Sequence, residues 1–189
     1  LPAIGAAGSL AVNKAIVIDT TVPTVAITST TTGVSDGSTT SNTTIALTFT
    51  TSESTTDFIV GDITVGNGAL SSFTAVSGTS YTATFTPTGP GACTIDVAAD
   101  KFTDGASNDN TASDQFNWTF DNVAPTVTNV TSTKADGSYK AEEVIPITIT
   151  FSEAVNVTGT PQITLETGET DAVVNYSSGT TTNTLTFNY

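Results

Sequence analysis

The residues best suited to chemistry in this sequence lie in one acidic stretch, Asp100 to Gln115, which reads DKFTDGASNDNTASDQ. Its only cation is Lys101. Three uses fit such a stretch: catalysis by paired carboxylates, binding of a divalent cation by oxygen ligands, or turn formation by Asp, Asn and Gly. The choice depends on which elements position these side chains.

Catalysis is the least favoured of these uses. The chain has no histidine, so no Ser-His-Asp set can form, and its aromatic content is 7%. The single tryptophan, Trp118, alternates with Phe116 and Phe120, which indicates packing in a strand rather than sugar stacking. Cys93 lies in another alternating pattern without a basic partner, which favours a buried apolar role. We therefore expect no enzymatic activity.

Composition excludes further classes. The net charge is −14, with 4 lysines against 18 acidic residues, so the chain repels phosphate backbones and nucleic-acid binding is not expected. No apolar run approaches the ~20 residues of a membrane span, and residues 1–12 lack a charged start typical of a signal peptide. We expect both ends of the sequence to be interior cuts of a longer chain.

The elements that must position the acidic stretch are β-strands. Nearly a quarter of the residues are threonine, a β-branched residue that suits half-exposed strands. Apolar and polar residues alternate, between clusters of turn residues, in six segments: 43–50, 80–87, 92–98, 116–120, 145–151 and 184–189. Short strands at regular spacing predict an all-β fold of antiparallel β-sandwiches with about seven strands each.

An internal repeat divides the chain. The segment IALTFTTSE (45–53) matches IPITITFSE (145–153) at an offset of 100 residues, and DTTVPTV (19–25) matches DNVAPTV (121–127) at an offset of 102. A period of this length equals one sandwich. We predict the last strand and linker of a preceding domain in 1–21, a complete sandwich in 22–122, and a further sandwich in 123–189 without its last strands.

The linker D-x-x-x-P-T-V, the I-x-x-T-F-x-x-S-E segment and the F-T-D-x-x-x-N loop resemble those of bacterial Ig-like domains, which repeat in tandem in large secreted adhesins and biofilm surface proteins. The resemblance covers essentially the whole chain and implies tandem Ig-like sandwiches with Greek-key connections. It implies an extracellular or cell-surface location, adjacent repeats as partners, and Ca²⁺ bound at domain junctions. Whether neighbouring copies also pack into a fibre stays open.

In a sandwich whose successive strands alternate in direction, the loops after the second, fourth and sixth strands lie at the same end as the start of the first strand. This end faces the preceding domain and gathers carboxylates and amides from three segments, a set of hard oxygen ligands that suits Ca²⁺. Asp121 and Glu153 repeat the pattern at the second junction. The predicted metal ligands are Asp19, Glu53, Asp57, Asp104, Asn108, Asp109, Asp121 and Glu153.

Three functions remain after these exclusions. Repetition favours a non-enzymatic stalk or spacer in a surface adhesin or fibre, stiffened by calcium between domains. The alternatives are a carbohydrate- or ligand-binding module and an accessory domain of a secreted enzyme. A binding module would show an exposed aromatic patch, and the sequence offers no sign of one.

Overall fold

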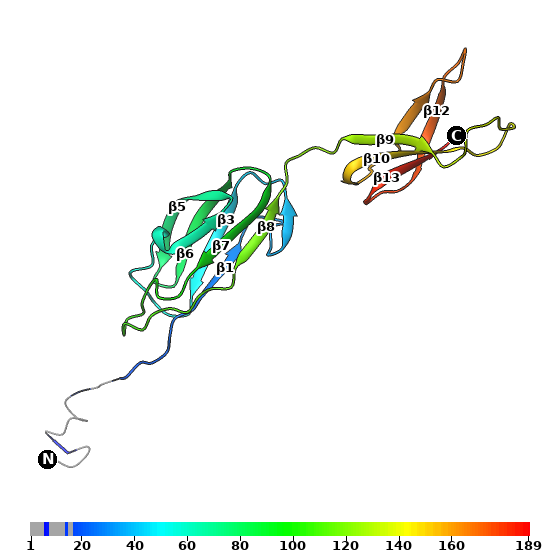
Figure 1. The fold of residues 1–189 in the computed structure, drawn as a ribbon. Helices are drawn as coiled ribbons and strands as arrows, with labels where there is room; N and C mark the ends of the chain where they lie inside the picture. Colours follow the sequence, from blue (N-terminus) through cyan, green and yellow to red (C-terminus); the bar gives the residue numbers. More distant parts are fainter. Residues whose placement is uncertain (1–5, 8–13, 15–16) are drawn as a thin grey trace. The chain divides into compact units, whose positions relative to one another are not determined.

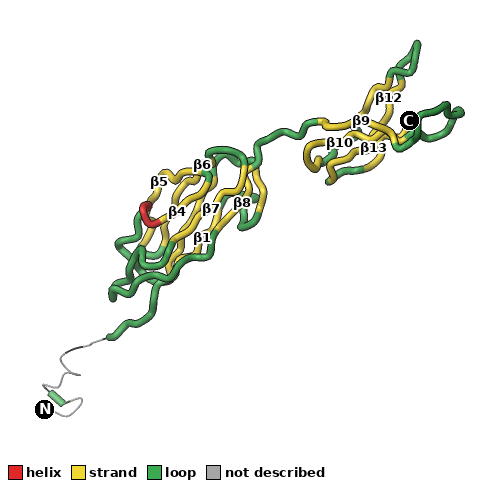
Figure 2. Tube along the Cα trace, viewed as in Figure 1, coloured by secondary structure: helices red, strands yellow, loops and turns green. Residues whose placement is uncertain are grey.

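The computed structural model describes residues 6–7, 14 and 17–189, and the chain divides into two compact units (Figures 1 and 2). We call Leu1–Asn122 unit 1 and Val123–Tyr189 unit 2. The predicted strand of a preceding domain, in residues 1–21, falls largely outside the described residues.

Unit 1 is a sandwich of two four-stranded sheets with the orders β1-β3-β6-β5 and β2-β8-β7-β4. A single 3-10 turn, η1 (Val60–Asp62), precedes β4. The strands are β1 (Val25–Ser29), β2 (Ser38–Thr40), β3 (Ile45–Thr51), β4 (Ile63–Gly66), β5 (Gly68–Ser77), β6 (Ser80–Pro87), β7 (Gly91–Val97) and β8 (Phe116–Phe120).

The core of unit 1 lies between these two sheets. In β3 the side chains of Ile45, Leu47 and Phe49 are fully buried, and they pack in one cluster with residues of β7 and β8 from the other sheet. Trp118 stands edge-on to Phe85 with ring centroids 4.7 Å apart. Alternating residues of both sheets thus form one interior, and the predicted all-β sandwich is confirmed.

One strand pair departs from the antiparallel rule. β2 pairs with β8 in parallel, with Ser38 opposite Trp118 and Thr40 opposite Phe120. The chain therefore starts in one sheet with β1 and crosses to the edge of the other with β2. A single residue, Asn67, separates β4 from β5 and turns the chain with φ 56°.

Unit 2 is a single five-stranded sheet with the order β11-β12-β13-β10-β9. Val174, Leu185 and Phe187 are buried, and a set of half-buried apolar residues packs around them. The strands are β9 (Val127–Ser132), β10 (Pro146–Val155), β11 (Gln162–Leu165), β12 (Ala172–Ser178) and β13 (Thr182–Asn188).

Candidate metal centre

The acidic stretch forms a long loop between β7 and β8, and Asn110 holds it in place. Asn110 is 2% exposed, and its Oδ1 accepts hydrogen bonds from the backbone N–H groups of Lys101 (2.7 Å) and Phe102 (2.9 Å). Its Nδ2 donates to the carbonyl oxygens of Ala98 (2.9 Å) and Thr111 (2.7 Å). With Phe102 buried in the core, the loop is fastened at its base. Sequence reasoning passed over Asn110, and the lone Phe102 in a polar loop was the signal that something must anchor it.

Asp104 is the buried carboxylate of this loop, 7% exposed. Its Oδ1 accepts from the N–H groups of Ala106 (2.8 Å) and Asn108 (2.9 Å), and its Oδ2 accepts from Asn108 Nδ2 (2.8 Å). These bonds, the Asn108 side chain first, lower the pKa of Asp104. The loop therefore presents Asp104 as a fixed anion at neutral pH.

Asp57 ties the loop after β3 to the same loop. Its two carboxylate oxygens accept from the N–H of Thr103 at 3.1 Å, and Oδ2 also accepts from the Thr103 hydroxyl at 2.9 Å. Burial is the largest single influence on Asp57 and acts to raise its pKa, but hydrogen bonds from Thr55 and Thr103 together outweigh it and lower the pKa. Asp57 thus serves as a clamp between two loops.

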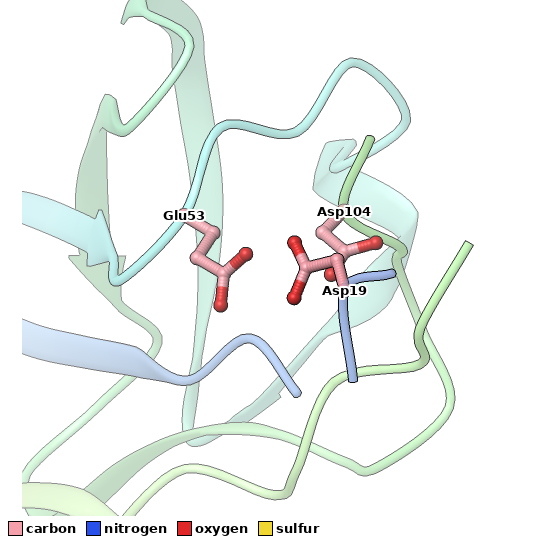
Figure 3. Close-up of side chains that lie close together, drawn as sticks. All are labelled: Asp19, Glu53 and Asp104. Atoms are coloured by element: carbon pink, nitrogen blue, oxygen red, sulfur yellow. The ribbon is translucent and has the colours of Figure 1, made fainter. Parts of the chain in front are cut away.

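Three carboxylates from three separate segments converge beside this clamp (Figure 3). One oxygen each from Asp19, Glu53 and Asp104 lies within 4.8 Å of the others. Asp19 comes from the segment before β1, Glu53 from the loop after β3, and Asp104 from the loop before β8. The fold therefore gathers residues 85 positions apart at one end of unit 1.

The electrostatics of this cluster are unbalanced. Glu53 Oε1 is buried and accepts no hydrogen bond within the described part of the chain. Burial, and then the charges of Asp19 and Asp104, raise the pKa of Glu53. The one ion pair among the described residues joins Lys134 to Glu143 in unit 2, so no described lysine forms an ion pair with the cluster.

Such a donor set fits a hard divalent cation. Carboxylate oxygens are ligands that Ca²⁺ binds at 2.3–2.6 Å. A cation here would give Glu53 Oε1 the positively charged partner that it lacks. Asp19 Oδ1 already accepts from the N–H of Thr21 (3.0 Å), which leaves its second oxygen free of described bonds. Asp19, Glu53 and Asp104 are the residues that would hold the ion.

The other five predicted ligands are not among the three converging carboxylates. Asn108 supports it, since its amide donates to Asp104 and, at 3.3 Å, to the carbonyl oxygen of Asp19. Asp57 is engaged by Thr103, and Asp109 is exposed and forms a backbone bridge opposite Thr103. Asp121 follows β8 at the end of unit 1, and Glu153 is half-buried on β10 of unit 2.

The two packed sheets of unit 1 define the class of the molecule as an immunoglobulin-like domain. The family model of the bacterial Ig-like domain matches residues 19–120, from Asp19 to the end of β8, and the chain belongs to this family. No curated protein and no solved structure matches the chain. Among the described residues, no helix has the length and apolarity to span a membrane.

Proposed function

We propose that the chain is a non-enzymatic structural repeat, a stalk or spacer segment of a large surface adhesin or fibre. One observation carries the proposal: the internal repeat extends from sequence to topology. The strand order β1-β3-β6-β5 of unit 1 recurs in unit 2 as β9-β10-β13-β12. A stalk needs many similar units, and membership in the bacterial Ig-like family supports this role and a location outside the cell.

We infer that its neighbours along a longer chain are further repeats. Asp19 stands before β1 of unit 1, and Asp121 stands at the corresponding place before unit 2. A cation bound by Asp19, Glu53 and Asp104 would fasten the segment that enters unit 1 to two of its loops. The proposed consequence is a stiffer entry to the domain, with calcium as the ion.

Calcium binding is tested by melting the chain in chelator and in increasing calcium, with Trp118 fluorescence reporting on unit 1. Extracellular modules bind calcium with dissociation constants of about 10⁻⁴ to 10⁻³ M. At ~100 times the dissociation constant the ion would add about 2.7 kcal/mol to the unfolding free energy. Asp104→Asn should abolish this gain.

Asp114→Asn is the matched control, since it removes one exposed carboxylate from the same loop outside the cluster. It should leave the calcium response intact. A melting temperature that calcium does not change would refute calcium binding. If both variants lose the calcium-dependent stabilisation equally, that stabilisation comes from nonspecific charge screening.

The surface location is tested separately. An antibody against the chain should label intact cells of the source organism, and external protease should remove the label. Labelling only after lysis would contradict the stalk role whatever calcium does.

A further inference from the structure

The outward face of the sheet β1-β3-β6-β5 carries no charge. None of these four strands contains an acidic or basic residue. In unit 1 the carboxylates lie in loops, apart from Asp62 in η1 and Asp96 on β7 of the opposite sheet. Soluble surfaces usually carry about 25–35% charged residues, so a whole sheet face without any is unusual in a chain of net charge −14.

The side chains on this face are threonine, serine and alanine in register. One row crosses all four strands, because Thr28 pairs with Thr48, Thr48 with Thr82, and Thr82 with Thr74. The next row is Ala26, Thr50, Ser80 and Ser77. We call this surface the threonine face.

Three of the four hydroxyls in the central row are not used by the domain itself, and the fourth, that of Thr74, donates to the carbonyl oxygen of Ser72 (3.2 Å). No hydrogen bond within the described part of the chain involves the hydroxyl of Thr28, Thr48 or Thr82, whereas Thr51, Thr55 and Thr103 use theirs to hold loops. The face therefore offers short side chains with free hydroxyls and methyls. Ordering such side chains costs less conformational entropy than ordering Lys or Glu.

Unit 2 repeats the arrangement. Thr131, Thr148 and Thr186 pair in register across β9, β10 and β13, and Asn129, Thr150 and Thr184 form the next row. The outward side of a sheet with the same strand order is thus again threonine-rich and uncharged along these rows.

We propose that the threonine face is a lateral interface, on which a second copy of this chain packs sheet to sheet. Two chains of net charge −14 repel each other, and contact through carboxylates would add the cost of their desolvation. The threonine face is the broad surface of unit 1 where the desolvation cost does not arise, and salt screens the remaining net repulsion. A second copy presents the same uncharged face, so a two-fold, self-complementary contact is available.

The expected contact is weak in one unit and stronger in an array. Four strands about 4.8 Å apart, with about five residues each, cover roughly 330 Å². A stable interface needs about 800 Å² per partner, so one face falls short. Repeats that carry the face at regular intervals would add their contacts, and two long chains would adhere by avidity. The inference extends the proposed stalk to bundles of stalks and does not depend on calcium.

The test is sedimentation equilibrium of the full chain in chelator over a concentration series, at low salt and at ~1 M NaCl, where the Debye length is about 3 Å. The weight-average mass should rise with concentration at high salt. Thr82→Glu, at the centre of the face, should weaken the association at least ~10-fold, since it sets like charges against each other across the contact.

Thr119→Glu is the matched control, because Thr119 is exposed on β8 and points outward from the opposite sheet. It should change the association less than ~2-fold. Thr28→Glu, on the edge strand β1, serves as a second variant if Thr82→Glu fails to fold. Concentration-dependent NMR shifts of wild-type amides should cluster on β1, β3, β5 and β6.

A chain that stays monomeric at high salt would overturn the proposal. So would equal losses from Thr82→Glu and Thr119→Glu, or shifts confined to the apolar side of unit 2. None of these outcomes bears on surface labelling of cells or on calcium binding, so the two proposals fail independently.

Discussion

Unit 1 and unit 2 build the same four-stranded sheet, but unit 1 alone covers its inner side with a second sheet. Leu47 of β3 is 1% exposed, whereas Ile147, at the equivalent place on β10, is half-buried. In unit 1 the cover consists mainly of β7 and β8, and residues 123–189 contain no counterpart of either strand. The alternating pattern of these strands is thus enough to form the four-stranded sheet, but burial of its inner side requires the second sheet.

A second difference follows from the first. β4 of unit 1 pairs with β7. β11 contains Ile163-Thr164, which matches Ile63-Thr64 of β4 at the offset of 100 residues, but β11 pairs with β12 and extends the first sheet. A strand without its partner thus joins an available edge, as expected from its unpaired N–H and C=O groups. That residues 123–189 form part of a sandwich without its last strands stays a prediction.

The largest expected effect is a difference in the loss of unfolding free energy when equivalent core positions of the two units are mutated. Leu47→Ala should lower the unfolding free energy of unit 1 by about 3 kcal/mol, because it opens a cavity in a closed core. Ile147→Ala should cost unit 2 only about 1 kcal/mol, since solvent already reaches the site. Hydrogen exchange resolved by residue measures both. Equal costs would mean that the inner side of unit 2 is covered in solution.

A smaller effect concerns the loop that only unit 1 possesses. Asn110→Ala leaves two N–H groups and two carbonyl oxygens without their partner, and each buried unsatisfied group costs about 1–3 kcal/mol. After partial solvation we expect a loss of about 2 kcal/mol by urea unfolding. Asn42→Ala, whose side chain makes no described hydrogen bond, is the control and should lose less than about 0.5 kcal/mol. Similar losses would show that Asn110 is no special anchor.

The smallest expected effect is the direction in which the stability of unit 1 changes with pH because of Glu53. In chelator, the raised pKa of Glu53 means that its charged form destabilises the folded state at neutral pH. As the pH falls toward the ordinary glutamate value of 4.5, folded Glu53 takes up its proton before unfolded Glu53 does, so unit 1 gains stability. Below the ordinary aspartate value of 3.8 this gain is offset, because Asp57 and Asp104 have lowered pKa values and lose their hydrogen-bonded charge.

Glu53→Gln isolates that effect. In chelator at pH 7 the variant should be more stable than the wild type, and in calcium it should be less stable. Urea unfolding at pH 7 and pH 5 measures both, with Glu166→Gln in an exposed loop of unit 2 as the control. If the stability of the variant depends on pH as that of the wild type does, the charged form of Glu53 does not destabilise the metal-free state.

Six strands, β3, β6, β7, β8, β10 and β13, were predictable because their alternation of apolar and polar residues is local. The segments 80–87 and 116–120 coincide with β6 and β8. β5 and β2 escaped prediction because their Ser, Gly and Thr residues carry a turn-like composition, and pairing with β6 and β8 decides their conformation.

The candidate site was predictable only in outline. Strand alternation indicated which loops share an end, and Asp19, Glu53 and Asp104 do converge there. It could not show that Asp57 would be taken up by Thr103, or that Asn110 would hold the loop, since both depend on contacts between distant segments. The role of the converged residues as metal ligands stays a prediction.

The parallel pairing of β2 with β8 has a mechanical consequence for a chain under tension. Force on the segments before β1 and after β8 would pull β2 and β8 along their length in opposite directions. The hydrogen bonds between the two strands would then be loaded in shear, all at the same time. The bonds from Gly37 N to Asn117 O and from Asp121 N to Thr40 O lengthen this seam at both ends. We expect unit 1 to yield at a higher force than unit 2 in single-molecule pulling, and a reversed order would show that the seam bears no load.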